Sequence, residues 1–215
     1  MSLELYYHPL ASYCWKVLIA LYENETPFEA RVIDLADAEQ RQQLAALWPY
    51  TKFPVLHDHA RKQVVPETSV IIEYLAQHYP GRVPLLPADP ALALEVRLQD
   101  RVYDLYVDDP MGKIVIDKLR PAGMNDPHGV AQAKQLLETT YDFAESTLRT
   151  RTWAAGDVFT MADCAAAPAL YYANRVHPIG EARPNTSAYL ARLLERPSFK
   201  RVLAEAEPYF PMFPG

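Results

Sequence analysis

The short segment 9–17 carries three side chains that can do sulfur chemistry: Ser12, Tyr13 and Cys14. A helical spacing of apolar residues follows them, so they are expected near a helix start. A hydroxyl that hydrogen-bonds a sulfur there stabilises the thiolate, whereas a free thiol has a pKa near ~8.5. Ser12 is placed like an N-cap, and we predict it as the activating residue. Cys14 is an alternative, because a cysteine near a helix start can itself be reactive.

A second group of polar side chains suits a small anion. Glu67 and Thr68 open an amphipathic pattern, and the start of a helix offers free N–H groups and a positive dipole end. Such a site favours a carboxylate. Lys52, in the preceding segment TKFPVL, can meet a second carboxylate.

A small α/β unit must position these residues. Apolar or alternating runs predict strands, and spacings near 3.6 predict helices. The expected strands are 3–7, 28–33, 53–57 and 63–65, and the expected helices are 12–24, 38–47 and 67–79. The order β-α-β-α-β-β-α gives a four-stranded mixed sheet whose first half is a right-handed parallel crossover.

The proline-rich stretch 80–90 is typical of a linker, and no alternating strand pattern appears beyond it. The rest of the chain is predicted to be helical. The expected helices are 91–119 with a bend near Pro110, 127–148, 160–176, 186–195 and 198–205.

Composition and charge exclude several classes of protein. The net charge of −6 argues against a nucleic-acid-binding surface, which is normally basic. The cysteines Cys14 and Cys164 form no cluster, so no metal site is predicted and both are expected to be reduced. The N-terminus does not resemble a signal peptide, and no stretch approaches the ~18–20 apolar residues of a membrane span. We expect a cytoplasmic protein with no membrane or nucleic-acid partner.

Four segments, in this order, resemble the glutathione transferase superfamily: YYHPLASYCWKV, TKFPVL, PETSVIIEYL and WAAGDVFTMADCAAAPAL. The resemblance covers essentially the whole chain. It implies an α/β plus all-α fold: a thioredoxin-like domain at 1–80, a linker at 81–89 and an all-helical domain at 90–215. In the last segment, Thr160 and Asp163 have the spacing of a capping box, which we interpret as a folding signal.

The resemblance also implies how glutathione binds. A cis bond between Phe53 and Pro54 would turn the backbone of Val55 toward the cysteinyl backbone of glutathione. The Glu67 side chain would take the γ-glutamyl ammonium, and the hydroxyl and N–H of Thr68 its carboxylate.

The activating residue and the acceptor pocket are less directly implied. Aligned on WKVLIAL, the serine of related classes falls on Ala11, so Ser12 requires a one-residue shift in the loop. Tyr7, on the first strand, is a further alternative by resemblance to tyrosine-type classes. Apolar and aromatic residues between the domains are expected to line the acceptor site. The candidates are Tyr103, Tyr106, Met111, Tyr171 and Tyr172.

Together these implications predict a detoxification-type glutathione transferase. Ser12 would stabilise the thiolate of glutathione, the co-substrate, which attacks a small hydrophobic electrophile. A homodimer is expected. Two alternatives stay open: a glutathione-dependent thiol reductase or peroxidase acting through Cys14, and a non-catalytic binding or interaction protein.

Overall fold

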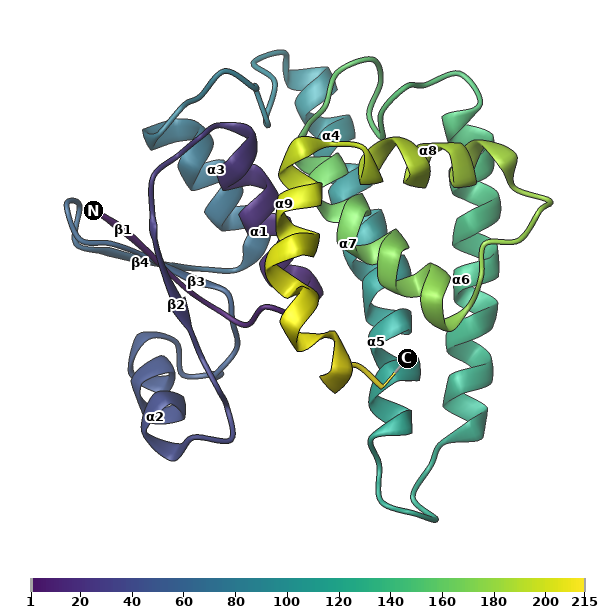
Figure 1. The fold of residues 1–215 in the computed structure, drawn as a ribbon. Coiled ribbons are helices and arrows are strands. Elements are labelled where there is room, and N and C mark those ends of the chain that lie inside the picture. The colour runs from purple at the N-terminus through teal and green to yellow at the C-terminus, as the bar shows by residue number, and fades with distance from the viewer. Residues whose placement is uncertain (1, 215) are drawn as a thin grey trace.

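The computed structural model describes residues 2–214 and shows a small mixed sheet beside a larger array of helices (Figure 1). The sheet has the strand order β2-β1-β3-β4, in which β1 and β2 are parallel and the other neighbours antiparallel. Its strands are β1 (Leu3–Tyr7), β2 (Glu29–Val32), β3 (Val55–Asp58) and β4 (Gln63–Pro66). This confirms the predicted thioredoxin-like sheet.

Alternation along β1 assigns the two faces of the sheet. Leu3 and Leu5 are buried in the main core with α1 (Ser12–Glu23) and α3 (Thr68–His78). On the other face, Val55 of β3 packs with Leu44 of α2 (Ala38–Leu47). The sheet therefore lies between two helices on one side and one helix on the other (Figure 1).

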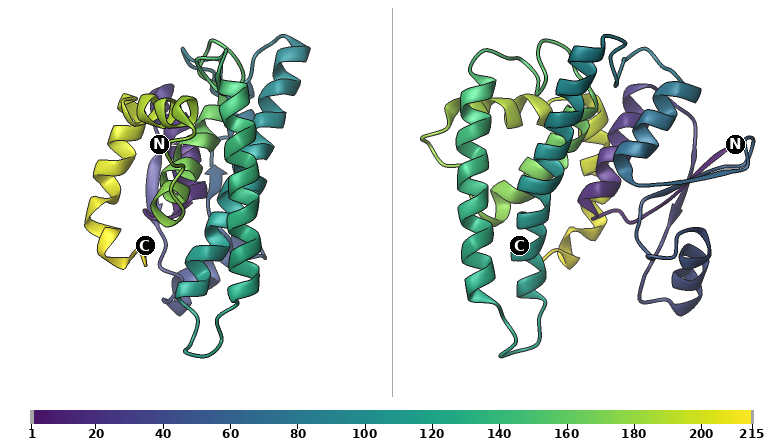
Figure 2. Two further views of the ribbon diagram at one scale, coloured as in Figure 1. Left: turned by 90° about the vertical axis from the view of Figure 1, so that its right-hand side faces the viewer. Right: turned by 180° about the vertical axis from the view of Figure 1, so that it is seen from behind.

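The second layer is all helical, as predicted, and α7 lies at its centre, where it packs against both α1 and α4. Figure 2 shows α5 and α6 side by side and extending beyond the rest of the molecule. The helices are α4 (Pro90–Tyr103), α5 (Asp109–Lys118), α6 (Pro127–Leu148), α7 (Met161–Val176), α8 (Pro184–Leu194), α9 (Pro197–Ala206) and a 3₁₀ turn, η2 (Glu207–Met212). No described helix is long and apolar enough to cross a membrane.

The helix predicted at 91–119 differs from the structure in one respect. A π-helical segment, η1 (Asp104–Asp108), separates α4 from α5. Pro110 has no N–H to give to a carbonyl four residues earlier, and it stands in the first turn of α5. The wider π-helical turn just before Pro110 accommodates the missing hydrogen bond. The predicted bend therefore takes the form of a π-helical segment that precedes the proline. Such π segments are frequent at functional sites.

The predicted capping box forms at the start of α7. The Asp163 carboxylate, fully buried, accepts the backbone N–H of Thr160 at 2.8 Å. It also accepts the N–H of Ala154 at 2.8 Å and the hydroxyl of Tyr189 at 2.6 Å. Asp163 thus ties three segments together, as expected of a folding signal.

A buried charge cluster joins the two layers. Lys16 of α1 is 1% exposed, and its Nζ lies 2.6 Å from Asp100 Oδ1 and 2.7 Å from Asp104 Oδ2. The same ammonium donates to Ser69 Oγ of α3 at 3.0 Å. Arg101 also contacts both carboxylates. The helical layer thus supplies the counter-charges for a lysine buried in the sheet domain.

Candidate functional site

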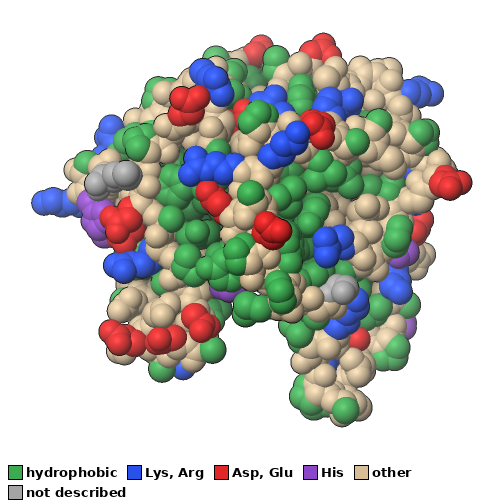
Figure 3. All heavy atoms as spheres, viewed as in Figure 1, with side chains coloured by type: hydrophobic (Ala, Val, Ile, Leu, Met, Phe, Trp, Pro, Cys, Tyr) green, Lys and Arg blue, Asp and Glu red, His purple; other side chains and the backbone are tan. Residues whose placement is uncertain are grey.

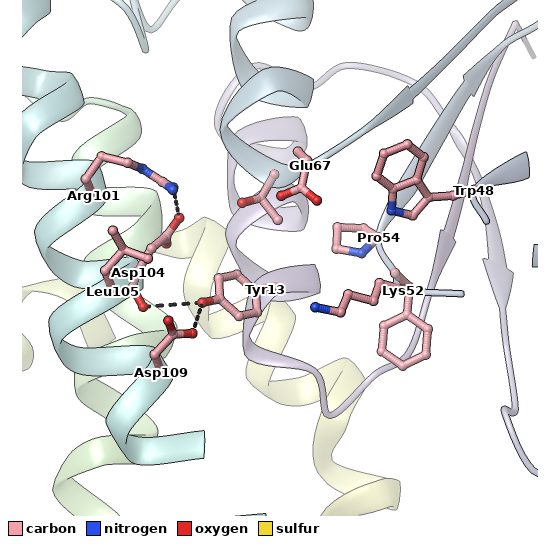
Figure 4. A pocket seen from close by; sticks show the side chains of 11 residues that line it. Tyr13, Trp48, Lys52, Pro54, Glu67, Arg101, Asp104, Leu105 and Asp109 are labelled. Atoms are coloured by element: carbon pink, nitrogen blue, oxygen red, sulfur yellow. Dashed lines mark hydrogen bonds and ion pairs between the residues drawn. The ribbon is translucent and has the colours of Figure 1, made fainter. Parts of the chain in front are cut away.

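A cavity of about 210 Å³ opens where the sheet domain meets α4 and the π segment (Figure 4). It brings together five residues that the sequence predicted for glutathione binding: Lys52, Phe53, Pro54, Glu67 and Thr68. The remaining lining residues are Tyr13, Trp48, Arg101, Asp104, Leu105 and Asp109. Side chains from segments far apart in the sequence thus converge on one space between the two layers.

The Phe53–Pro54 peptide bond is cis, as the sequence analysis expected. It directly precedes β3, in which Val55 is fully buried and pairs with Pro66 of β4. Pro66 has no N–H and cannot donate to the carbonyl of Val55. The Val55 side chain does not line the cavity; its predicted role rests on its backbone alone.

The start of α3 has an unusual backbone. Thr68 is the first residue of the helix, and Glu67, just before it, has a φ of +69°. This left-handed region is uncommon for residues other than glycine and marks a place to look for function. The Glu67 side chain makes no capping hydrogen bond, and it points into the cavity (Figure 4). The first turn of α3 also has N–H groups without an intrahelical partner, and its first residue, Thr68, lines the cavity.

The cavity carries charges of both signs. Lys52 and Arg101 supply cations, and Glu67, Asp104 and Asp109 supply carboxylates. Burial raises the pKa of Asp104, while the charge of Lys16 opposes that shift. A cavity of mixed charge suits a ligand that itself bears carboxylates and an ammonium group.

Ser12 is the first residue of α1, and Ala11 rather than Ser12 takes the N-cap position. The N-cap prediction was therefore one residue off. The Ser12 hydroxyl instead donates to Asp108 Oδ2 of the π segment at 2.9 Å. Asp108 is 5% exposed, and its Oδ1 has no hydrogen-bond partner among the described residues. Burial raises the pKa of Asp108 to about 7; the hydrogen bond from Ser12 lowers it, and the charges of Asp104 and Asp109 raise it.

A second, largely apolar cavity of about 270 Å³ lies on the other side of the α1 start. Ser12 lines this cavity, whereas Tyr13, the next residue, lines the first one. Of the predicted acceptor residues, Met111 and Tyr172 line it. The C-terminal residues Met212, Phe213 and Pro214 cover part of its wall. The start of α1 thus separates a charged cavity from an apolar one.

Comparison with family models divides the chain in the same way as the structure, into a sheet domain and a helical layer. Residues 5–83 match the glutathione S-transferase N-terminal domain, and residues 107–197 match the glutathione S-transferase C-terminal domain. The chain belongs to the glutathione S-transferase family.

Individual relatives cover nearly the whole chain. A glutathione S-transferase structure from Methylobacillus flagellatus with glutathione bound is 26% identical, with a TM-score of 0.85 over 94% of this chain and 98% of its own. A probable maleylacetoacetate isomerase of Caenorhabditis elegans is 30% identical over 91% of this chain and 90% of its own. The FtsZ-localized protein A of Caulobacter vibrioides is 29% identical over 97% and 94%. The family therefore includes proteins named for different activities.

The two alternative activating residues, Cys14 and Tyr7, line neither the charged nor the apolar cavity. Cys14 is fully buried, and burial raises the pKa of its thiol; the backbone N–H of His8 donates to its sulfur at 3.5 Å. Tyr7 is 9% exposed, and burial raises the pKa of its hydroxyl.

Three predicted acceptor residues also lie elsewhere. Tyr103 is 2% exposed and packs against Tyr189 in the core of the helical layer. Tyr106 is 47% exposed on the π segment. Tyr171 packs against Trp15 and Phe210, with ring centroids 5.5 and 6.3 Å apart. Helical spacing alone did not distinguish the faces of α4 and α7 that meet the cavity.

Several lining residues were given no role in the site by the sequence. Tyr13 donates its hydroxyl to Asp109 Oδ1 at 2.9 Å, and its pKa is raised by burial and by the nearby carboxylates. Arg101 and Asp104 reach the cavity from the helical layer. Tyr13 was named beside Ser12 as a side chain near the helix start, but Ser12 was chosen in its place. Arg101 and Asp104 were not predicted, because only the packing of the two layers brings them to the cavity.

Proposed function

We propose that this chain is a cytoplasmic glutathione transferase that joins the glutathione thiolate to a small hydrophobic electrophile. One observation carries the proposal: a cis-proline segment, the start of α3 and charges of both signs line a single cavity. Thr68 and the α3 N-terminus bind the γ-glutamyl carboxylate, and Glu67 binds its ammonium. Lys52 pairs with a second carboxylate, and the Val55 backbone binds the cysteinyl unit. The sulfur then lies at the start of α1, beside the apolar cavity.

The proton released by the thiol needs an acceptor, and Asp108 supplies one. Ser12 donates to Asp108 in the free protein, so its hydroxyl proton is not available to a sulfur. When the thiol donates to Ser12 Oγ, the Ser12 proton passes to Asp108 Oδ2. The result is a thiolate that accepts a hydrogen bond from Ser12, while protonated Asp108 donates to Ser12. Charge is conserved and water is not required.

Calorimetric titration with glutathione tests the binding half of this proposal. Glu67→Gln keeps the size of the side chain but removes the charge that pairs with the ammonium. We expect its affinity for glutathione to fall by about tenfold or more, since hydrogen bonds to charged groups contribute ~1.5–3 kcal/mol. Glu195→Gln, an exposed carboxylate of the α8 C-cap, is the matched control. Wild-type protein that gives no heat with glutathione would refute the proposal.

Two other functions remain distinguishable by experiment. A thiol reductase or peroxidase working through Cys14 has little support, because that thiol is fully buried. Cys14→Ser would abolish reductase activity and leave conjugation intact. A non-catalytic interaction protein is favoured by Ala11 at the serine position of related classes, and FtsZ-localized protein A is a relative. That function predicts no turnover with any electrophile.

A homodimer completes the proposal. Four apolar side chains of α4 and its neighbours are left exposed: Val70, Leu94, Leu98 and Leu105 are 41–69% exposed. Apolar patches of this kind mark association surfaces, and a second copy of the chain can cover them. Light scattering during size-exclusion chromatography should give a mass of twice the chain mass of 24.4 kDa. A mass of one chain at micromolar concentration would contradict the dimer.

A further inference from the structure

Two histidines and a glutamate lie together on the sheet, away from both cavities. The ligand atoms of Glu4, His57 and His59 all lie within 4.8 Å of one another. None of the three lines the charged or the apolar cavity. From this geometry we propose that Glu4, His57 and His59 form a binding site for a divalent transition-metal ion such as Zn²⁺.

The backbone holds these ligands on one face. Glu4 of β1 is paired directly with His57 of β3. His59 follows two residues later, so its side chain points to the same side as that of His57. The His59 N–H also bonds the Ser2 carbonyl at 2.8 Å, which extends the β1–β3 pairing to this position. The imidazole centroids of His57 and His59 are 3.9 Å apart.

The distances suit a small ion. His59 Nε2 lies 3.0 Å from Glu4 Oε2. Two ligand atoms on one Zn²⁺, each bound at about 2.0–2.1 Å, are separated by roughly 3.0–3.4 Å. Glu4 and His59 therefore already have the separation that a shared ion requires. Rotation of the half-buried His57 ring brings in the third ligand, and water can fill the open position.

Neighbouring side chains orient the Glu4 carboxylate for metal binding. Glu4 is 7% exposed, so its carboxylate is held by the side chains around it. The Tyr6 hydroxyl donates to Oε2 at 2.9 Å, and Arg31 Nε lies 3.2 Å from Oε1. Such outer contacts orient a metal-binding carboxylate. Arg31 can stay on Oε1 while Oε2 meets the ion.

The ligand set also selects the ion. Imidazole nitrogen favours Zn²⁺ and its transition-metal neighbours, whereas Mg²⁺ and Ca²⁺ prefer oxygen ligands. No metal site was predicted from the sequence, because Cys14 and Cys164 lie far apart and form no Cys/His cluster. Here one ligand comes from β1, one from β3 and one from the residue directly after β3, some fifty residues later.

Calorimetric titration of the untagged full-length protein with Zn²⁺ tests the proposal. We expect one ion per chain, no comparable response to Mg²⁺, and at least about tenfold weaker Zn²⁺ binding in His57→Gln and in His59→Gln. His59 has a side chain 49% exposed, so its replacement should leave the fold intact. His128→Gln, an exposed histidine of α6, is the control and should bind as the wild type does.

Absence of a one-to-one complex in the wild type would overturn the metal site. Equal affinity in the His57, His59 and His128 variants would overturn it as well, because the ion would then be bound elsewhere. Glutathione affinity should be the same in the His59→Gln variant as in the wild type. The metal site and the proposed transferase function can therefore fail independently.

Discussion

The hydrogen bond from Ser12 to Asp108 gives the most decisive prediction for catalysis. Asp108→Asn keeps the shape of the side chain but removes the carboxylate that accepts from Ser12, which is the proposed acceptor of the thiol proton. In the wild type, the base form of Asp108 is lost as the pH falls through its raised pKa of about 7. We therefore expect kcat/KM for an aryl halide to decline below about pH 7. In the variant, the thiol must ionise by itself, with a pKa near ~8.5.

The size of the effect follows from these two values. At pH 7 about half of Asp108 is in its base form, whereas only ~3% of an unassisted thiol is ionised. Proton transfer to Asp108 is opposed by the ~1.5-unit difference between the two pKa values, which the hydrogen bond from Ser12 to the thiolate has to offset. When it does so fully, the variant should be slower by about 15-fold at pH 7, which is the upper limit of the effect, and the difference should nearly vanish above about pH 9.5. Stopped-flow ultraviolet absorbance of the bound thiolate measures the same ionisation directly.

Controls separate this role from a structural one. Asp142→Asn changes an exposed carboxylate of α6, 70% exposed, and should keep the wild-type pH profile. Ser12→Ala breaks the same proton path, so combining it with Asp108→Asn should add little to either single change. A pH profile in Asp108→Asn that is parallel to the wild type would refute the proton path. The glutathione site could still be correct in that case.

Three further changes test the site and the contacts that hold it. Lys52→Ala should weaken glutathione binding by about tenfold in calorimetry, with the exposed Lys134→Ala unchanged, because only Lys52 lines the charged cavity. Lys16→Met should lower the free energy of unfolding in urea by about 3–5 kcal/mol, since it leaves buried carboxylates without their main partner; a loss below 1 kcal/mol would contradict the role of the cluster. Asp163→Ala should cost roughly 3 kcal/mol or more in the same assay, because three buried donors lose their acceptor. Wild-type stability in that variant would show that the capping box is dispensable.

Much of the fold was predictable because local rules determine it. A short apolar run identified β1, and the predicted limits of α2 and α6 agree with the structure to the residue. The capping residues of α7 were visible as a spacing of Thr160 and Asp163. The π segment was not predictable by the same rules, because it depends on how the backbone hydrogen bonds rearrange around Pro110, which has no N–H.

The candidate site was predictable in part, for a related reason. Lys52, Pro54 and Glu67 lie in segments whose local sequence signals a turn or a helix start, and all three line the cavity. Arg101 and Asp108 lie inside a regular helical pattern, where spacing identifies a buried face but not its neighbour. The hydrogen bond from Ser12 to Asp108 exists only because the two layers pack with the π segment against the start of α1.

The buried Lys16 cluster has a consequence for how the two parts of the chain can be separated. A fragment ending near residue 80 would carry an ammonium without Asp100 and Asp104, and the charged cavity would lose the wall formed by Arg101. Such a fragment should be poorly soluble and unable to recognise the tripeptide. A chimera that carries the helical domain of another protein would need carboxylates at the positions of Asp100 and Asp104. Each module therefore depends on the other for the pairing of its buried charges.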